Sequence, residues 1–290
     1  MKFAIHGRPV NDNSLKFIKE LFSVLNKKGA KVSLFSPFAN FLDKKGISNN
    51  FETYSTREEM GEADIVLSLG GDGTLLEAIT YIGDHEIPIL GINMGRLGFL
   101  AATAQEDAEK AIDALYNKAY KTEDRTLIKV VSDDDLFNGV NFGLNEFTIL
   151  KRDTSSMILV HTYIDGEYLN SYWADGLIVS TPTGSTGYSL SCGGPLVLPQ
   201  SNNFIIAPVS PHNLNVRPMV VSDNSIISFQ IEGRSKHFLV SLDSRSKSVP
   251  ADIKLAVKKE DFKVKLISLK GYNYLQTLRS KLNWGLDMRN

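Results

Sequence analysis

The first hundred residues alternate short apolar runs with longer segments in which apolar residues recur at helical spacing. The apolar runs are nearly continuous, as in strands buried in a parallel sheet, and occupy residues 2–6, 31–35, 64–69 and 87–92. Apolar residues from Leu15 to Leu25 predict a helix over residues 13–28 that Gly29 ends, and residues 74–81 predict another. This alternation predicts a doubly wound α/β domain, which binds ligands at the carboxyl ends of its strands.

The pattern changes near residue 120, where helical spacing gives way to a succession of short strands. A helix predicted over residues 105–117 is followed by strands predicted at residues 127–131, 147–150, 157–164, 176–180, 204–209, 225–231, 238–242 and 262–268. Turn signals such as Asp165-Gly166 and Asp175-Gly176 separate these strands. Residues 272–286 return to helical spacing, and a lone helix after a β domain needs a partner surface.

We therefore predict three parts in this chain of 290 residues, a length that suits two domains. Residues 1–103 form an α/β domain with a parallel sheet, and residues 104–271 form an all-β domain. Residues 272–290 carry a terminal helix that we expect to return to the first domain and dock there.

Charge and cysteine content narrow the function classes. The formal net charge is −1, which provides no electrostatic reason to expect nucleic acid or an anionic membrane as a partner. Cys192 is the only cysteine, so no internal disulfide can form, which fits a reducing compartment. The N-terminus lacks a secretory pattern, and no stretch approaches the ~20 apolar residues of a membrane span. We expect a soluble, cytoplasmic protein.

One candidate site lies at residues 69–78, LGGDGTLLEA, at the carboxyl end of a predicted strand. Glycines between a strand and a helix often cradle phosphate, yet the central Asp72 is negative, as phosphate is. The stretch is not a Walker loop, because no lysine follows the glycines, and the GxGxxG spacing is missing. Taken alone, it also fits a tight turn in which Asp72 is the N-cap of the next helix.

A second candidate site is residues 174–195, ADGLIVSTPTGSTGYSLSCGGP, a dense run of Thr, Ser and Gly after a predicted strand. Hydroxyls and free backbone amides in one loop suit a ligand with many oxygen atoms, and a long polar surface loop is the alternative. Within this run Cys192 has no recognisable catalytic partner and is interpreted as structural.

Three further features are weak signals by themselves. Asn145-Glu146 precedes an apolar strand and fits a solvated loop. His212 lies between two prolines and is interpreted as a structural histidine, and Asp243 fits a simple carboxylate at a strand end.

Together these segments resemble the NAD kinase family. That family is marked by GGDGT, by an Asn-Glu or Asn-Asp pair and by DGxxxSTPTGSTAY ahead of GGP. This chain has the three in the same order, at residues 70–74, 145–146 and 175–195. Residues 91–100, 210–218 and 278–285 also resemble family segments, so the resemblance covers nearly the whole chain.

The chain departs from the family pattern at three positions. Gly187 stands where the family usually has Ala, and Trp173 stands where many members carry a basic residue. Ser244 follows Asp243 where Gly is common, and for this reason Asp243 is assigned no role.

The resemblance implies transfer of the γ-phosphoryl group of ATP to the 2′-hydroxyl of the adenosine ribose of NAD, which forms NADP. Asp72 would be the catalytic base that accepts the hydroxyl proton. Backbone amides, together with Mg²⁺ or another divalent metal, would offset the repulsion between the Asp72 carboxylate and the phosphates. No residue is assigned as a metal ligand. The implied phosphate-binding residues are Gly70, Gly71 and Thr74. The implied NAD-binding residues are Asp72, Gly73, Asn145, Glu146, Asp175, Thr186, Gly187, Tyr188, Ser189, Leu190 and Ser191.

Within that NAD pocket the resemblance implies a division of tasks. Asn145 would pair with an adenine edge, Glu146 would accept from ribose hydroxyls, Asp175 would contact the nicotinamide half, and Tyr188 would pack near the adenine. NAD and ATP are the implied partners, and members of the family assemble into homodimers or homotetramers.

Two other functions fit parts of the pattern. A lipid kinase of the GGDGT type would share the first motif, but the Ser/Thr/Gly loop favours a polar nucleotide over acyl chains. A regulator that binds NAD without chemistry would keep the pocket but would not need Asp72.

Overall fold

The computed structural model describes residues 1–290 except 48–49, 96–97, 153–155 and 285–290. Contacts divide the chain into two units, which are Met1–Glu123 together with Lys265–Asn290, and Asp124–Val264. Among the described residues, no helix is both long and apolar enough to cross a membrane.

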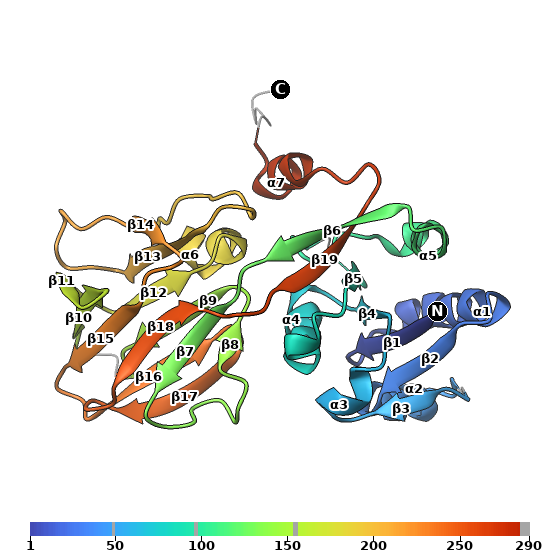
Figure 1. Cartoon of the computed structure of the whole chain (residues 1–290), viewed down its shortest axis with the longest axis horizontal. Helices are drawn as coiled ribbons and strands as arrows, with labels where there is room; N and C mark the ends of the chain where they lie inside the picture. The colour runs from blue at the N-terminus through green and yellow to red at the C-terminus, as the bar shows by residue number, and fades with distance from the viewer. Residues whose placement is uncertain (48–49, 96–97, 153–155, 285–290) are drawn as a thin grey trace. The chain divides into compact units, whose positions relative to one another are not determined.

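The first unit is an α/β fold in which strands and helices alternate along the chain (Figure 1). Its helices are α1 (Asp12–Lys27), α2 (Ser36–Lys44), α3 (Arg57–Met60), α4 (Asp72–Ile82), α5 (Ala108–Tyr116) and α7 (Tyr274–Leu282). Its strands are β1 (Lys2–Gly7), β2 (Lys31–Phe35), β3 (Glu52–Tyr54), β4 (Ile65–Leu69), β5 (Ile89–Ile92), β6 (Tyr120–Arg125) and β19 (Val264–Leu269).

These strands form one sheet in the order β3-β2-β1-β4-β5-β19-β6. β1 pairs in parallel with both β2 and β4, β4 pairs in parallel with β5, and β5 with β19. Every residue of β4 is buried, which explains its uninterrupted apolar run. Gly7 lies opposite Leu69 in the register of β1 and β4, so both strands end at the carboxyl edge, where folds of this class bind ligands.

The first unit extends beyond the predicted boundary at residue 103. α5 packs against α1, where Lys28 forms an ion pair with Asp113 and its ammonium lies 5.5 Å from the centre of the Tyr116 ring. β6 joins the same sheet, and β19 returns from the far end of the chain to pair Leu266 with Ile89.

The assignment of residues 104–123 and 265–271 to the all-β domain is therefore wrong. The local pattern of β19 does not identify its partner, because parallel neighbours in a sheet come from segments that are far apart in sequence, here Leu266 and Ile89. Lys265 adds a further link within the first unit, because its ammonium lies 2.9 Å from a carboxylate oxygen of Glu86.

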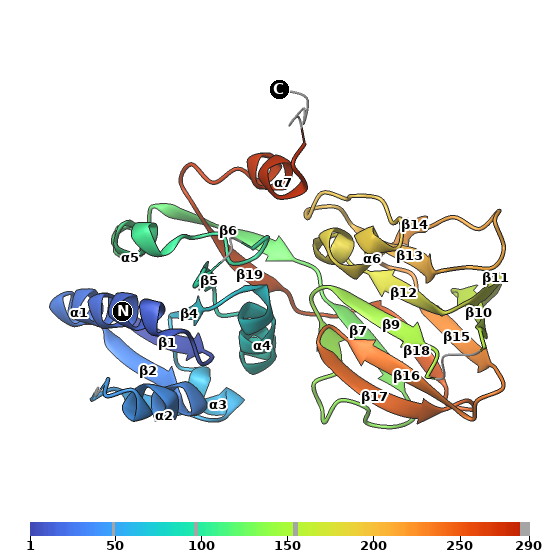
Figure 2. The same cartoon turned by 180° about the vertical axis from the view of Figure 1, so that it is seen from behind.

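The second unit is built from antiparallel strands (Figure 2). One sheet has the order β11-β10-β15-β18-β7-β8 and the other has the order β14-β13-β12-β9-β16-β17. The strands of these two sheets are β7 (Ile128–Ser132), β8 (Phe142–Gly143), β9 (Glu146–Leu150), β10 (Ile158–Ile164), β11 (Glu167–Ala174), β12 (Gly176–Ser180), β13 (Asn203–Val209), β14 (Met219–Ser222), β15 (Ile227–Glu232), β16 (His237–Leu242), β17 (Arg245–Pro250) and β18 (Leu255–Lys259).

Apolar residues of both sheets share one core, in which Val160 and Phe229 of one sheet join Phe147 and Val179 of the other. The predicted combination of an α/β domain and an all-β domain is confirmed by this architecture. The predicted Asp165-Gly166 turn is also present, with both residues at positive φ, between β10 and β11.

β12 is buried on both faces, unlike most strands of an antiparallel sheet. Leu177 and Val179 point into the common core, whereas Ile178 belongs to a second apolar cluster that includes Ile205 and Cys192. The segment after β12 folds into a 3-10 turn (Thr183–Thr186) and the short helix α6 (Tyr188–Ser191), and this segment supplies Cys192 to that cluster. The second motif is thus packed on its own sheet.

α7 groups with the first unit, as expected for the terminal helix. Asn273 caps its N-terminus, Leu278 is buried, and the Lys281 ammonium lies 6.0 Å from the centre of the Phe99 ring. The helix ends at Leu282, where Asn283 is the C-cap in left-handed conformation, and not at residue 286 as predicted; residue 286 itself lies outside the described residues.

Candidate functional site

The GGDGT segment lies at the carboxyl edge of the parallel sheet, between β4 and α4. Gly71 is the N-cap of α4, in extended conformation, and no side chain caps the helix. The alternative in which Asp72 caps this helix is therefore wrong, because Asp72 is already the first helical residue. Its carboxylate is directed instead at the segment that follows β5.

Three backbone amides hold the Asp72 carboxylate. Oδ2 accepts from the amide of Phe99 at 2.9 Å, and Oδ1 accepts from those of Leu100 and Ala101 at 3.0 and 2.9 Å. A carboxylate offers about four acceptor sites, so one site on Oδ2 is left for another donor. The three bonds fix the carboxylate relative to the sheet, because Asn93 and Thr103, at the two ends of this segment, are themselves bonded to each other.

The glycines of this region fall into two kinds. A Cβ on Gly98 would lie 1.9 Å from Oδ1 of Asp72, and a Cβ on Gly70 would lie 2.2 Å from Oγ1 of Thr74, so both positions require close approach. At Gly71 and Gly73, by contrast, no described atom lies within 4 Å of such a Cβ. Gly70 donates its amide to the carbonyl of Ile92, and Thr74 is buried.

In the second unit, Asn145 and Glu146 stand at the start of β9 and are enclosed by two other segments. Thr181, just after β12, donates its amide to the carbonyl of Asn145 at 2.9 Å and its hydroxyl to the carbonyl of Leu144 at 2.5 Å. From the turn between β16 and β17, the Asp243 carboxylate accepts from the amides of Leu144, Asn145 and Glu146.

Glu146 is a strongly perturbed acid in this cluster. Burial, and then the nearby charge of Asp243, raises the pKa of Glu146 to about 8. Its Oε2 is buried and finds no hydrogen-bond partner among the described residues. A Cβ on Gly187 would lie 3.3 Å from that Oε2, so Glu146 faces the loop of the second motif. An unpartnered buried carboxyl oxygen is a marker of a functional site.

The second motif surrounds this carboxyl with a braced loop. Several of its hydroxyls bond to nearby backbone atoms: Ser180 to the carbonyls of Asn145 and Thr181, Ser185 to the backbone of Val197, and Thr186 to the carbonyl of Thr183. The interpretation of the whole run as ligand-facing hydroxyls is therefore too broad, since part of it stabilises the loop itself.

The remaining predicted residues of the loop differ in exposure. Tyr188 and Ser191 are exposed, Gly187, Leu190 and Thr186 are half-buried, and Ser189 is fully buried with no partner for its hydroxyl among the described residues. Burial, and then the charges of Cys192, Asp175 and Glu146, raises the pKa of Tyr188. Tyr188 therefore lies within electrostatic reach of both acidic residues assigned to the pocket.

Asp175 lies at the start of β12 and is paired with a cation that sequence analysis did not identify. The ammonium of Lys151 is 2.6 Å from Oδ1 of Asp175. Nearby, His212 donates its amide to the carbonyl of Trp173 and its ring lies 4.6 Å from that of Trp173, which gives His212 the expected structural contact. Burial raises the pKa of the Cys192 thiol, in agreement with a structural cysteine.

The predicted site residues thus form two groups, each within its own unit. Asp72 and its flanking glycines belong to the first, and Asn145, Glu146, Asp175 and residues 186–191 belong to the second. Sequence reasoning missed the contribution of Asp243 and of the amides of residues 99–101. Gly98 was the available signal for the latter, since a glycine one residue before an apolar segment permits close approach.

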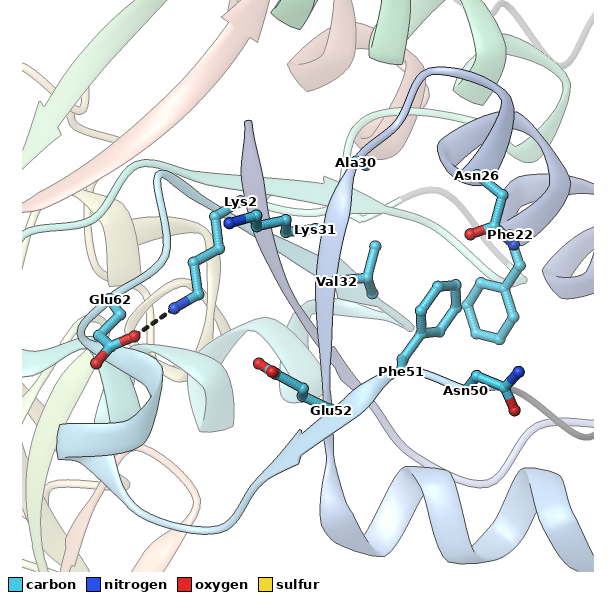
Figure 3. Close-up of a pocket in the computed structure, with 10 residues that line it drawn as sticks. All are labelled: Lys2, Phe22, Asn26, Ala30, Lys31, Val32, Asn50, Phe51, Glu52 and Glu62. Carbon is cyan, nitrogen blue, oxygen red and sulfur yellow. Dashed lines mark hydrogen bonds and ion pairs between the residues drawn. The ribbon is translucent and has the colours of Figure 1, made fainter.

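A large hollow in the first unit lies away from these residues. It has a volume of about 910 Å³ and is lined by residues at the amino ends of β1, β2 and β3, the edge opposite the GGDGT segment. Figure 3 shows Phe22 and Phe51 facing each other there, and Lys2 paired with Glu62. With Lys2 paired to Glu62 and the two aromatic rings packed together, this hollow lacks the fixed carboxylates of the two groups above.

Comparison with known proteins places the whole chain beside one family. The ATP-NAD kinase N-terminal domain matches residues 3–120, and the ATP-NAD kinase C-terminal domain matches residues 144–269. NAD kinase from Cytophaga hutchinsonii is 58% identical over 292 residues, and NAD kinase from Flavobacterium psychrophilum is 45% identical over 294 residues. Each of these two matches covers 100% of this chain and 100% of the relative.

Solved structures show the same fold. An NAD kinase from Archaeoglobus fulgidus in complex with ATP is 28% identical, with a TM-score of 0.77, and the match covers 98% of this chain and 99% of that one. Yeast NADH kinase complexed with NADH is 20% identical, with a TM-score of 0.89, and the match covers 100% of this chain and 89% of that one.

Proposed function

The chain belongs to the ATP-NAD kinase family, and we propose that it forms NADP with Asp72 as the base that activates the 2′-hydroxyl of the adenosine ribose. The overall reaction is transfer of the γ-phosphoryl group of ATP to that hydroxyl of NAD. The observation that carries the role of Asp72 is the fixed carboxylate at the carboxyl edge of the sheet, with one acceptor site unused.

Asp72 accepts the ribose proton through Oδ2. A hydroxyl is a weak nucleophile until its proton is removed, and a positioned base contributes about 10²–10⁴-fold to the rate. The amides of Phe99, Leu100 and Ala101 leave one site on Oδ2 for the ribose hydroxyl and prevent the carboxylate from rotating away. This arrangement also explains why an acidic residue lies among phosphate-binding glycines: the Asp72 carboxylate interacts with the attacking hydroxyl and does not bind phosphate.

Gly71 and Gly73 supply backbone donors to the phosphates. The first amides of a helix have no partner within the helix, and the absence of a described neighbour at either glycine lets a phosphate approach. Gly70 and Thr74 support this turn from behind, since the amide of Gly70 is bonded to Ile92 and Thr74 is buried.

Glu146, Asn145, Asp175 and the residues Thr186, Gly187, Tyr188, Ser189, Leu190 and Ser191 form the NAD pocket. The unpartnered Oε2 of Glu146 accepts from ribose hydroxyls, and Asn145 pairs with an edge of the adenine. Tyr188 packs near the adenine, and Asp175, held by Lys151, contacts the nicotinamide half.

A divalent metal, Mg²⁺ by preference, accompanies ATP. The described residues hold no cluster of three or more His, Cys, Asp or Glu side chains, which fits an ion that takes few protein ligands and is held mainly by phosphate oxygens. When bound, such an ion neutralises charge that develops on the transferred group. Asp72 is the carboxylate within the GGDGT turn, and because its one unused acceptor site takes the ribose hydroxyl, phosphate oxygens and water would hold the ion.

The working form that we propose is a cytoplasmic homodimer or homotetramer. The family resemblance supports the assembly, and the unpaired Cys192 supports a reducing compartment. Light scattering of the purified chain would identify the assembly.

The direct test of Asp72 is the substitution Asp72→Asn, measured as NADP formed from NAD, ATP and Mg²⁺. We expect kcat to fall by about 10²-fold or more, while the dissociation constant for NAD changes far less. Asn keeps the size of the side chain but cannot accept the ribose proton. Unchanged turnover in a variant that melts at the wild-type temperature would exclude the base.

The same assay separates the alternatives. A lipid kinase of the GGDGT type would transfer ³²P from ATP to diacylglycerol rather than to NAD, and a regulator would bind NAD and form no NADP. The full-length similarity to NAD kinases favours neither alternative.

A further inference from the structure

We propose that Asp243 is a positioning residue of the NAD pocket: its carboxylate, placed by the turn between β16 and β17, fixes the backbone from which Asn145 and Glu146 project. The proposal rests on the function assigned above to Asn145 and Glu146, and it extends that function to a residue outside the family motifs.

The geometry is a three-point clamp. Oδ2 of Asp243 accepts from the amide of Leu144 at 2.8 Å, and Oδ1 accepts from those of Asn145 and Glu146 at 2.7 and 3.2 Å. The amide of Asp243 in turn donates to the carbonyl of Glu146 at 2.9 Å. The pairing of β9 with β16 ends at Phe147 and Leu242, so the side chain continues the ladder where backbone pairing stops.

The segment from Leu144 to Glu146 is thereby held from two sides. Its amides are bonded to Asp243, while the carbonyls of Leu144 and Asn145 are bonded to Thr181. Gly143 provides the room, since a Cβ there would lie 3.0 Å from Cγ and Oδ1 of Asp243. Loss of Asp243 would release one side of this segment and leave three amides without their acceptor.

The turn itself does not require an aspartate. Asp243 and Ser244 form the two-residue connection of a hairpin, and Asp243 has a φ of +52°. Asn and Gly adopt that conformation as readily as Asp does. Only Asp, however, presents two oxygens that accept from all three amides, so the residue matches the clamp rather than the turn.

The choice of Asp also has an electrostatic cost that a purely structural residue would avoid. Its carboxylate lies close enough to Glu146 to raise the pKa of that group, in addition to burial. Arg245 partly compensates Asp243, and its guanidinium donates to the carbonyls of Val140 and Phe142. Burial raises the pKa of Asp243 as well, while its three amide donors lower it, and Oε2 of Glu146 has no donor among the described residues.

The groups that face Glu146 are thus identified on each neighbouring element. Asp243 belongs to the β16–β17 turn and Tyr188 to α6, while Arg245, the first residue of β17, acts on the charge of Asp243. Asp175, at the start of β12, lies near Tyr188 and is paired with Lys151. Removal of the Asp243 charge therefore lowers the pKa of Glu146. It removes none of the side chains assigned to NAD binding.

The experiment is Asp243→Asn in the full chain, with Asp165→Asn as the matched control. Asp165 occupies the other two-residue turn at a φ of +51°, and its Oδ1 accepts one amide, that of Ile226, at 2.8 Å. At pH 9, where Glu146 is largely ionised in both proteins, we expect KM for NAD to rise about tenfold or more in Asp243→Asn, with KM for ATP within about twofold of wild type. The pH midpoint of kcat/KM for NAD should also move below that of wild type.

Asp165→Asn should change neither KM for NAD nor the pH midpoint of kcat/KM for NAD. A folded Asp243→Asn protein with the wild-type KM for NAD and the wild-type pH midpoint would overturn the proposal, and so would an equal shift in the control. If Asp243→Asn does not fold, Gly143→Ala decides, because its methyl group presses on the same carboxylate. It should raise KM for NAD, and an unchanged KM would count against the clamp.

Failure of the assigned function has a different signature. If wild type forms no NADP, or if Glu146→Gln leaves KM for NAD unchanged, the assigned roles of the pocket fail. If wild type is active and Glu146→Gln weakens NAD binding while Asp243→Asn does not, only the role of Asp243 fails.

Discussion

At the scale of single residues, the site depends on how closely backbone atoms approach two carboxyl groups. Asp72 and Asp243 lie in different units, yet each accepts from three successive backbone amides. In the proposed roles, the carboxylate of Asp72 meets a substrate, whereas that of Asp243 places its neighbours. In both cases a glycine, Gly98 or Gly143, leaves the space that the carboxylate occupies.

The close approach at Gly98 yields a prediction. Gly98→Ala would place a methyl group 1.9 Å from Oδ1 of Asp72, so the carboxylate or the segment must move. Because a displacement of about 1 Å can reduce a rate about 10²-fold, we expect a loss of that order in kcat. Gly95→Ala is the control, since no described atom lies within 4 Å of its Cβ. Steady-state NADP formation gives kcat for both variants. An equal loss of kcat in Gly98→Ala and Gly95→Ala would argue against displacement of Asp72.

Protonation of Glu146 yields a second prediction. Burial and the charge of Asp243 raise its pKa to about 8, so the carboxylate form increases as the pH rises through that value. Ribose hydroxyls donate to the carboxylate, and KM for NAD should therefore fall from pH 6 to pH 9. Glu146→Gln should raise KM about tenfold at pH 9 and abolish this slope. A slope that persists in the variant would belong to another group.

At the scale of elements, a buried polar link ties β1 to the helix that carries Asp72. His6 on β1 is fully buried, and its ring nitrogens lie 3.0 Å from the Tyr54 hydroxyl and 3.2 Å from Oε2 of Glu77 on α4. Arg8 donates to the same oxygen of Glu77 at 2.6 Å. Any loosening of this link would move α4, and with it the GGDGT turn.

The link predicts a dependence of stability on pH. Burial would raise the pKa of Glu77, but hydrogen bonds from His6 and Arg8 outweigh it and lower that pKa from 4.5 to about 2. A lowered acid pKa stabilises the fold above pH 4.5, and this contribution is lost as the pH falls from 4.5 towards 2. Glu77→Gln should therefore lower the melting temperature at pH 7, and the difference should shrink below pH 4.

Thermal melts followed by circular dichroism across this range provide the measurement. Glu20→Gln is a suitable control, because among the described residues Glu20 forms just an exposed pair with Lys16 at 3.8 Å. A difference between wild type and Glu77→Gln that is the same at pH 3.5 and pH 7 would contradict the link.

Elements that depend on local spacing were predictable from sequence, and those that depend on distant partners were not. The buried strand β4 and the helix predicted over residues 13–28 follow directly from the apolar pattern, and the observed helix α1 begins at Asp12 behind the N-cap Asn11, which that pattern does not identify. β19 was assigned to the wrong domain because its apolar run does not reveal that Ile89 is its neighbour. Asp243 was set aside because Ser244 departs from the family, although the clamp uses the side chain of Asp243 alone.

At the scale of the whole molecule, the two units differ in how the chain builds them. The second is one continuous segment, Asp124–Val264, whereas the sheet of the first begins with β1 (Lys2–Gly7) and needs β19 (Val264–Leu269), from the far end of the chain, to complete it. β19 lies between β5 and β6 in that sheet, and Leu266 and Ile267 are buried. Without β19, the hydrogen-bonding edges of two strands would be open and the apolar faces near them would be exposed.

This asymmetry predicts which part of the chain folds alone. A chain of residues 124–264 should unfold cooperatively, because both of its sheets and their common core are complete. A chain of residues 1–123 should lack a cooperative transition or melt at a much lower temperature. Addition of a peptide of residues 262–284 should restore part of that stability, since Leu266 can pair with Ile89 again. If residues 1–123 melt as the full chain does, and the peptide has no effect, then β19 is dispensable and the GGDGT turn does not depend on the returning segment.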